Sequence, residues 1–207
     1  MKINNIQRQN RRARYTITLN NGNVFGISEG VFISSGLAIG DSLEDDILSK
    51  LLQSENISKI KESAYSLLSY RSRSKHELKT RLLDKEYPIK DILPVLKELE
   101  NLGLINDQSF IESYVRDQVF LKNVGPYAVK SSLNKFRVDK KLVETAINNI
   151  YQQYPIPELI QSWLDKKKII PDQALDIKTK TKLINFLKRK GFSWGEIESK
   201  LLENNLI

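Results

Sequence analysis

The chain has 207 residues, and its 33 Lys and Arg outnumber its 25 Asp and Glu, giving a net charge of +8. Cysteine is absent and His76 is the single histidine, so disulfides, thiolate metal sites and histidine-rich metal sites are excluded. No apolar run reaches the ~18–20 residues that cross a bilayer, and the start of the chain lacks the apolar core of a secretory signal. We therefore expect a cytoplasmic protein without a membrane partner. Its basic balance favours nucleic acid or an acidic partner.

Residues 1–55 are predicted to form a basic arm, a small β-hairpin and an acidic helix. No acid precedes Glu29, and the arm contains Lys2, Arg8, Arg11, Arg12 and Arg14. Alternating apolar residues over 15–19 indicate a half-buried strand. Asn21-Gly22 is a typical two-residue hairpin turn, so the second strand is expected at 24–27.

From Asp41 the apolar spacing becomes helical, with Ser42 as the expected cap. The predicted buried stripe of this helix is Leu43, Ile47, Leu48, Leu51 and Leu52. Glu44, Asp45 and Asp46 in the first turn suggest either a cation site or compensation of the helix dipole. Because no glycine separates these acids, as an oxygen-ligand loop requires, we favour compensation of the dipole.

The remainder of the chain repeats. Five apolar positions recur 51 residues later, and again after a further 54 residues. These positions are Leu78, Leu82, Tyr87, Ile92 and Leu96, then Val129, Leu133, Val138, Val143 and Ile147, then Leu183, Leu187, Phe192, Ile197 and Leu201. The pattern predicts a mainly α protein, an elongated array of three tandem three-helix repeats over 56–105, 106–155 and 156–207. We expect a monomer.

Each repeat is predicted to contain three helices. They span 57–70, 74–85 and 89–101, then 107–121, 126–136 and 140–152, then 157–168, 179–190 and 194–204. Ser74, Gly125 and Thr179 are the predicted N-caps of the second helices, and Asp139 and Ser193 those of two third helices.

The sequence offers little catalytic chemistry. His76-Glu77 begins like a metalloprotease helix, but the second ligand is missing because residue 80 is Thr80. Gly36 and Gly40 lack the lysine and the spacing of a phosphate-binding loop. We therefore predict a protein that is not an enzyme and that has no cofactor, catalytic or metal site.

The basic residues are the candidates for contacts with a partner or with DNA. They are Arg11, Arg12, Arg14, Arg71, Arg73, Lys75, Lys79, Lys130, Lys135, Arg137, Lys178, Lys182, Arg189 and Lys190. Lys79 and Lys130 occupy equivalent repeat positions, and Lys178, Lys182 and Arg189 lie on one stripe. An ordinary solvated face is the alternative for each of them. Aromatic platforms for stacked bases are not evident, and Tyr127 and Trp194 are the best candidates for exposure.

Four short motifs resemble those of a known family. Residues 70–78, YRSRSKHEL, are similar to the R-x-R-S-x-x-E-L signature of the RecX family, which regulates the RecA recombinase. The segment 103–110, the pair Gly125-Pro126 and the segment 186–192, FLKRKGF, resemble further family motifs in the same order. The sequence departs from the family at Lys190, where the family has arginine, and in the long connection 169–178.

This resemblance implies tandem three-helix repeats and a partner, the RecA filament on single-stranded DNA. It also implies inhibition of ATP hydrolysis, strand exchange and co-protease activity, and thereby a role in DNA repair, recombination and the SOS response. Direct binding to single-stranded or duplex DNA is expected to be weak. Two alternatives remain open: a direct DNA-binding protein made of three-helix modules, and a helical scaffold without a DNA role.

Overall fold

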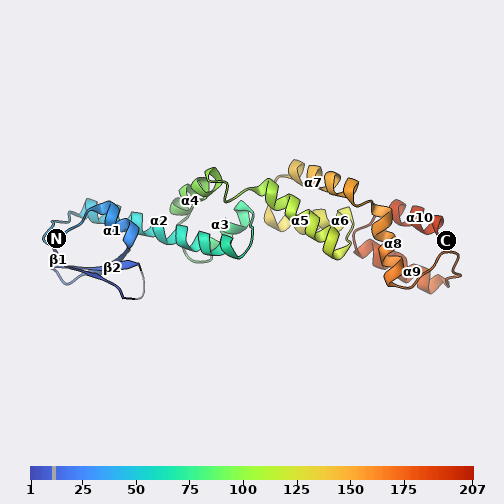
Figure 1. Ribbon diagram of the computed structural model, residues 1–207, viewed down its shortest axis with the longest axis horizontal. Coiled ribbons are helices and arrows are strands. Elements are labelled where there is room, and N and C mark those ends of the chain that lie inside the picture. Colours follow the sequence, from blue (N-terminus) through green and yellow to red (C-terminus); the bar gives the residue numbers. More distant parts are fainter. Residues whose placement is uncertain (11–12) are drawn as a thin grey trace. The chain divides into compact units, whose positions relative to one another are not determined.

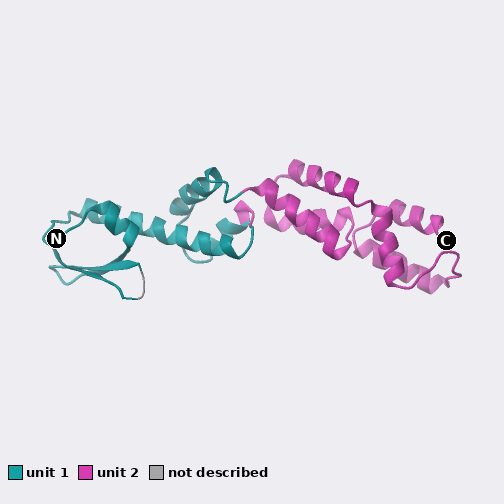
Figure 2. Cartoon of the chain, in the orientation of Figure 1, with its two compact units in different colours: residues 1–72, 77–105 teal, residues 73–76, 106–207 magenta. Residues whose placement is uncertain are grey.

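The computed structural model describes residues 1–10 and 13–207, so Arg11 and Arg12 lie outside the described residues. Within this part of the chain there are ten α-helices and one three-stranded antiparallel sheet (Figure 1). The predicted mainly α fold class is therefore confirmed. The chain divides into unit 1, residues 1–72 and 77–105, and unit 2, residues 73–76 and 106–207 (Figure 2).

The sheet of unit 1 has the order β1-β2-β3, with β1 at Ile3–Arg8, β2 at Arg14–Leu19 and β3 at Val24–Ser28. The hairpin predicted for β2 and β3 is confirmed, with Gly22 in its turn at a φ of 85°. The basic arm was predicted without a strand, and that was incomplete because residues 3–8 pair with β2. A bulge between Ile3 and Asn5 shifts the register of this pairing, which masks the alternation expected of a strand.

A short helix α1, Glu29–Ser35, and the start of α2, Asp45–Tyr70, pack on the sheet (Figure 1). Their shared core contains Ile3, Ile17, Leu19, Ile27, Val31, Leu43 and Leu51. The predicted stripe of the acidic helix is only partly right. Ile47 and Leu52 are 44% and 41% exposed, and Glu44 rather than Ser42 precedes the helix as its N-cap.

The two helices predicted on either side of residue 55 are one continuous helix, α2. No Gly or Pro interrupts its 26 residues. The second half of α2 packs with α3, Lys75–Leu83, and α4, Ile89–Asn101. Their core contains Ile60, Ala64, Leu78, Leu82, Ile92, Val95, Leu96, Leu99 and Ile105. Unit 1 thus holds two hydrophobic cores joined by a single helix.

Unit 2 contains the remaining helices. They are α5 at Asp107–Lys122, α6 at Pro126–Leu133, α7 at Lys140–Gln153, α8 at Ile156–Lys166, α9 at Ile177–Arg189 and α10 at Trp194–Glu203, with a 3₁₀ turn, η1, at Asn134–Phe136. One continuous core runs through all of these helices, from Phe110 to Leu206. The predicted repeats 106–155 and 156–207 therefore share a core.

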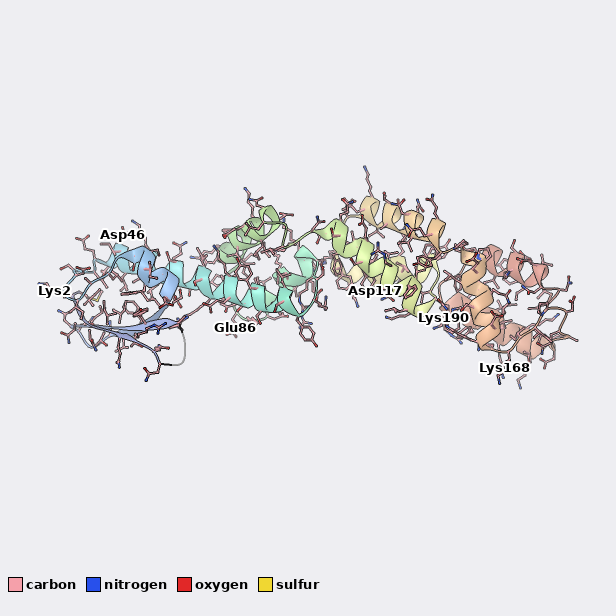
Figure 3. The ribbon with its side chains drawn as sticks, in the orientation of Figure 1. Lys2, Asp46, Glu86, Asp117, Lys168 and Lys190 are labelled. Atoms are coloured by element: carbon pink, nitrogen blue, oxygen red, sulfur yellow. The ribbon has the colours of Figure 1, made fainter. Side chains whose placement is uncertain are left out.

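The helical phase predicted from the repeat is confirmed. Thirteen of the fifteen recurring apolar positions are buried, and Tyr87 and Val138 pack half-buried against the same cores. Three residues at the same spacing, Glu86, Arg137 and Gly191, have positive φ values of 64°, 48° and 91°. Each ends the second helix of its predicted repeat in the left-handed conformation. Glu86 is labelled in Figure 3.

The predicted caps are partly confirmed. The Asp139 carboxylate accepts hydrogen bonds from the first turn of α7, and Ser193 forms a capping box with Glu196. The prediction for Thr179 was wrong: the cap of α9 is Asp176, whose carboxylate accepts the Thr179 N–H at 2.9 Å. The helix begins two residues earlier than predicted, at Ile177.

Candidate partner and nucleic-acid interface

Arg14 of β2, a candidate contact residue, is engaged by other groups of unit 1. Its guanidinium pairs with Glu55 of α2 and donates to the Gly26 carbonyl oxygen at 3.2 Å. The Glu55 side chain is only 2% exposed and also accepts the Ser28 N–H at 2.6 Å. A buried carboxylate requires such partners, so Arg14 serves the fold of unit 1. The Arg14 guanidinium, which we predicted to contact a partner, is therefore engaged within unit 1.

The basic residues at 71–79 differ in their exposure and in their contacts with other groups of the protein. The Arg71 guanidinium forms a two-pronged ion pair with Glu77. Arg73 is buried, at 8% exposed, and the Lys75 N–H donates to the Asp107 carboxylate at 2.7 Å. Lys79 is half-buried. The motif that carries the family resemblance is therefore largely engaged within the protein.

In unit 2, a groove of about 710 Å³ lies along α6 and α7. Its polar lining includes Tyr127, Lys130, Arg137 and Lys140, together with Glu144. The Lys130 ammonium pairs with Glu144 at 2.9 Å, both side chains being more than half exposed, so part of the positive charge is neutralised. The other two cations leave the groove with net positive charge. Nearby Lys135 is exposed, and its ammonium group lies 4.9 Å from the centre of the Phe136 ring.

Helix α9 is the most basic element of unit 2. Residues 177–190 contain six Lys and Arg and no acid. Lys178, Lys182 and Arg189 are all exposed, as predicted for a stripe. Within the residues that the structure describes, no cation of α9 forms an ion pair. Only the cap at its start, Asp176, is acidic, and the hydrogen bonds from Thr179 lower the pKa of its carboxyl.

A cluster of lysines on aromatic rings was missed by the sequence analysis. Trp163 of α8 and Phe186 of α9 meet edge to face, with ring centres 5.1 Å apart. The ammonium groups of Lys166 and Lys190 lie 4.9 and 4.2 Å from the Trp163 ring centre, and that of Lys167 lies 4.1 Å from Phe186. These five residues are called the lysine–aromatic cluster below. The rings come from two helices joined by a long connection, so spacing along the chain gave no signal for them.

Two aromatic residues beside this cluster are exposed, as predicted: Tyr127 is 66% and Trp194 43% exposed. The Tyr127 N–H donates to the Gly191 carbonyl oxygen at 3.1 Å, which fixes its backbone next to Lys190. The Lys188 ammonium lies 5.2 Å from the Trp194 ring centre. Basic and aromatic side chains therefore lie near one another at the end of α9. Lys190, at this end, is labelled in Figure 3.

Among the described residues, no group of three His, Cys, Asp or Glu side chains is arranged to hold a metal ion. In the same part of the chain, every helix is too short or too polar to cross a bilayer.

Comparison with known proteins gives a consistent result. A family model described as "RecX, first three-helix domain" matches residues 61–99. A "Regulatory protein RecX" from Pelodictyon phaeoclathratiforme is 33% identical over 138 residues, covering 67% of this chain and 84% of the relative. One of the same name from Halalkalibacterium halodurans is 30% identical, covering 93% and 73%. The match to a Leuconostoc citreum relative spans only 54% of that protein.

Two solved structures share the fold. A crystal structure of a regulatory protein RecX aligns with a TM-score of 0.72 at 24% identity, covering 96% of this chain and 98% of that chain. RecX from Lactobacillus salivarius aligns with a TM-score of 0.63 at 26% identity, covering 74% and 99%.

Proposed function

The chain belongs to the RecX family of regulatory proteins, and from this membership we propose that it binds RecA recombinase filaments on DNA and inhibits them. The activities to be inhibited are ATP hydrolysis, strand exchange and co-protease activity. The protein would act in the bacterial cytoplasm and modulate recombination, repair and the SOS response. It would do so without catalysis of its own, by occupying the filament.

The observation that carries this proposal is the charge of α9. Lys178, Lys182 and Arg189 are exposed and form no ion pair within the described residues, so their charge is available to a partner. A filament that encloses DNA has a strongly negative groove, and cations that enter it release counterions. Each exposed contact is worth only ~0–1 kcal/mol, so many must act together.

We propose further that the chain is organised as residues 1–55 followed by repeats at 56–105, 106–155 and 156–207. Lys79 and Lys130, at equivalent positions of the first two repeats, would add to the contacts of α9. In this arrangement unit 1 and unit 2 each supply basic residues to the filament.

The decisive experiment is a titration of recombinase ATPase activity. Wild-type protein is expected to inhibit at amounts well below one per recombinase subunit, and less effectively as salt rises. A single Lys→Ala change should weaken inhibition less than about tenfold, because each contact is small. Simultaneous reversal, Lys79→Glu with Lys130→Glu and Lys182→Glu, should abolish inhibition while the protein stays folded.

The matched control reverses three exposed lysines of unit 1 that belong to no proposed contact, Lys85, Lys90 and Lys97. Both triple variants change the net charge by the same amount. A difference between them in inhibition therefore reports on the specific surface and not on net charge. If the first triple variant folds and inhibits like the wild type, the basic residues are a solvated face and the proposed contacts are wrong.

The second candidate, a direct DNA-binding protein, is favoured by one observation, the basic groove along α6 and α7. A duplex reader of this kind would hold free duplex DNA tightly, with an affinity that falls steeply as salt rises. A filament regulator would bind the same duplex weakly and still inhibit the recombinase.

A further inference from the structure

We propose that unit 2 carries a binding site for single-stranded nucleic acid at the ends of α8 and α9. Lys166, Lys167 and Lys190 of the lysine–aromatic cluster would hold the phosphate backbone. The exposed rings of Tyr127 and Trp194 would stack bases. The site deepens the proposed function, because it names a surface through which the protein would touch the DNA of a filament.

Positive charge converges at the ends of α8 and α9. Three ammonium groups from two helix ends lie within 5 Å of the centre of Trp163 or Phe186, and those rings touch each other. None of the three forms an ion pair in the described part of the chain. Three ammonium groups gathered on two touching rings raise the local positive potential, which favours a bound polyanion.

Lysines at helix C-termini have an ordinary explanation, which is that they compensate the helix dipole. That explanation accounts for Lys166 at the end of α8 and for Lys190 just after α9. It does not account for their meeting on one Trp163 ring, since each helix end would be compensated equally well by a lysine that points into solvent. The convergence is therefore a separate feature.

The cluster is also ordered before any ligand binds. The Trp163 indole N–H donates to the Asn123 carbonyl oxygen at 2.6 Å, which fixes the ring. A fixed ring holds an ammonium group through its negative face. A free lysine loses rotamer entropy when it binds an anion, whereas a lysine already held on a ring loses less. Such a site favours phosphate more than the same charge on mobile side chains would.

The exposed aromatic residues decide between nucleic acid and an acidic protein segment. Tyr127 and Trp194 flank the Lys190-Gly191 turn, one through a backbone hydrogen bond and one through the chain itself. Base stacking on exposed rings alongside a basic track is typical of proteins that bind single strands. An acidic peptide has no need of such rings. Bases of a duplex are already stacked and would not reach them.

The test measures binding of fluorescein-labelled dT20 by anisotropy, with the full chain and no recombinase. The variant Lys166→Ala, Lys167→Ala, Lys190→Ala should bind at least about tenfold more weakly. Its plot of log affinity against log salt should be shallower by about 2, from ~0.7 for each lost phosphate contact. Because Lys190 is half-buried, the double variant that keeps Lys190 serves as a second measurement and should be intermediate.

The matched control, Lys85→Ala with Lys90→Ala and Lys97→Ala, removes equal charge from unit 1 and should stay within about twofold of the wild type. Tyr127→Ala with Trp194→Ala should weaken binding at least about fivefold. The chain has only two tryptophans, and dT20 should quench mainly Trp194, so Trp194→Phe should remove most of the quenching.

Three results would overturn the site: equal affinities for the cluster variant and the control, displacement of dT20 by polyglutamate of equal charge, or tighter binding of duplex than of dT20. These outcomes are distinct from failure of the proposed function. Wild-type protein that binds dT20 here yet leaves recombinase ATPase unchanged contradicts only the proposed function. Inhibition that survives while the cluster variant keeps full dT20 affinity contradicts only the site.

Discussion

Gly125 and Gly191 meet backbone to backbone, and a Cβ atom on Gly125 would lie under 3.0 Å from the Gly191 carbonyl group. The Gly125 N–H donates to the Lys190 carbonyl oxygen at 2.8 Å. Ser74, which lies 51 residues before Gly125, makes the corresponding contact with its hydroxyl, 3.3 Å from the Phe136 carbonyl oxygen. In both places the start of the second helix of one predicted repeat meets the end of the second helix of the next predicted repeat. The contact is made by the backbone at Gly125 and by a side chain at Ser74.

Gly191→Ala is expected to destabilise unit 2. A Cβ there would lie under 3.0 Å from the backbone of Ala128, and the φ of 91° is strained for any L side chain. Overpacking and left-handed strain together predict a loss of about 2–4 kcal/mol in the free energy of unfolding. Urea denaturation measures this. Gly195→Ala, within α10 and with open space around it, should be neutral or stabilising.

Arg137→Gly is expected to stabilise the protein by about 1 kcal/mol, because Arg137 holds a positive φ of 48° that glycine adopts without cost. The side chain is exposed, so little packing is lost. If Arg137 also contacts the filament, the same variant will inhibit recombinase more weakly while melting at a higher temperature. A lower melting temperature would contradict the conformational argument.

The helices of the predicted repeats could be foreseen because their apolar residues recur at helical spacing, and thirteen of the fifteen recurring residues are buried. The strand β1 could not, since the bulge after Ile3 puts its apolar residues, Ile3 and Ile6, out of alternation. The seven residues of α1 are too few to show a period. The continuity of α2 did leave a signal: no Gly or Pro occurs between Gly40 and Pro88.

The sequence shows which residues of the candidate site are basic, but it does not show which of them are exposed and which are engaged by other groups of the protein. A basic residue reads the same in the sequence whether it is exposed, like Lys182, or engaged, like Arg14. Its partner Glu55 lies 41 residues away, beyond any local pattern. The lysine–aromatic cluster escaped for the same reason, because Trp163 and Phe186 come from different helices.

Leu82→Ala, Leu133→Ala and Leu187→Ala should each lower stability by ~2–5 kcal/mol, since all three side chains are 1% exposed or less. Leu82 lies in a core of unit 1, whereas Leu133 and Leu187 share the core of unit 2. Differential scanning calorimetry is the measurement. Unchanged melting in all three variants would mean that the buried phase of these helices is wrong.

Glu55→Ala is expected to cost about 3–5 kcal/mol, because it leaves the Arg14 guanidinium and the Ser28 N–H without their buried acceptor. Arg14→Ala should likewise lower the stability of unit 1. Circular dichroism melting measures both. Should Arg14→Ala melt like the wild type and yet inhibit poorly, Arg14 would be a contact residue after all.

Tyr151 predicts a dependence of stability on alkaline pH. Burial, and to a lesser degree the charge of Glu196, raise the pKa of its phenol, which donates to the Val124 carbonyl oxygen at 2.6 Å. The folded pKa lies above the unfolded value of about 10, so this stabilisation is complete below pH 10 and is lost as pH rises further. Urea unfolding between pH 8 and 11 should show a smaller decline for Tyr151→Phe than for the wild type. Parallel declines would exclude this role.

Because α2 is one uninterrupted helix, the number of its residues between the two cores of unit 1 determines how those cores are oriented relative to each other. Leu51 belongs to the sheet core and Ile60 to the core with α3 and α4. One residue inserted between them would turn one core by about 100° about the helix axis and shift it by 1.5 Å relative to the other. A loop would absorb such an insertion. We therefore expect insertions and deletions to be tolerated in the turn at Asn21-Gly22 but not between Leu51 and Ile60, where the helix acts as a torsionally stiff spacer.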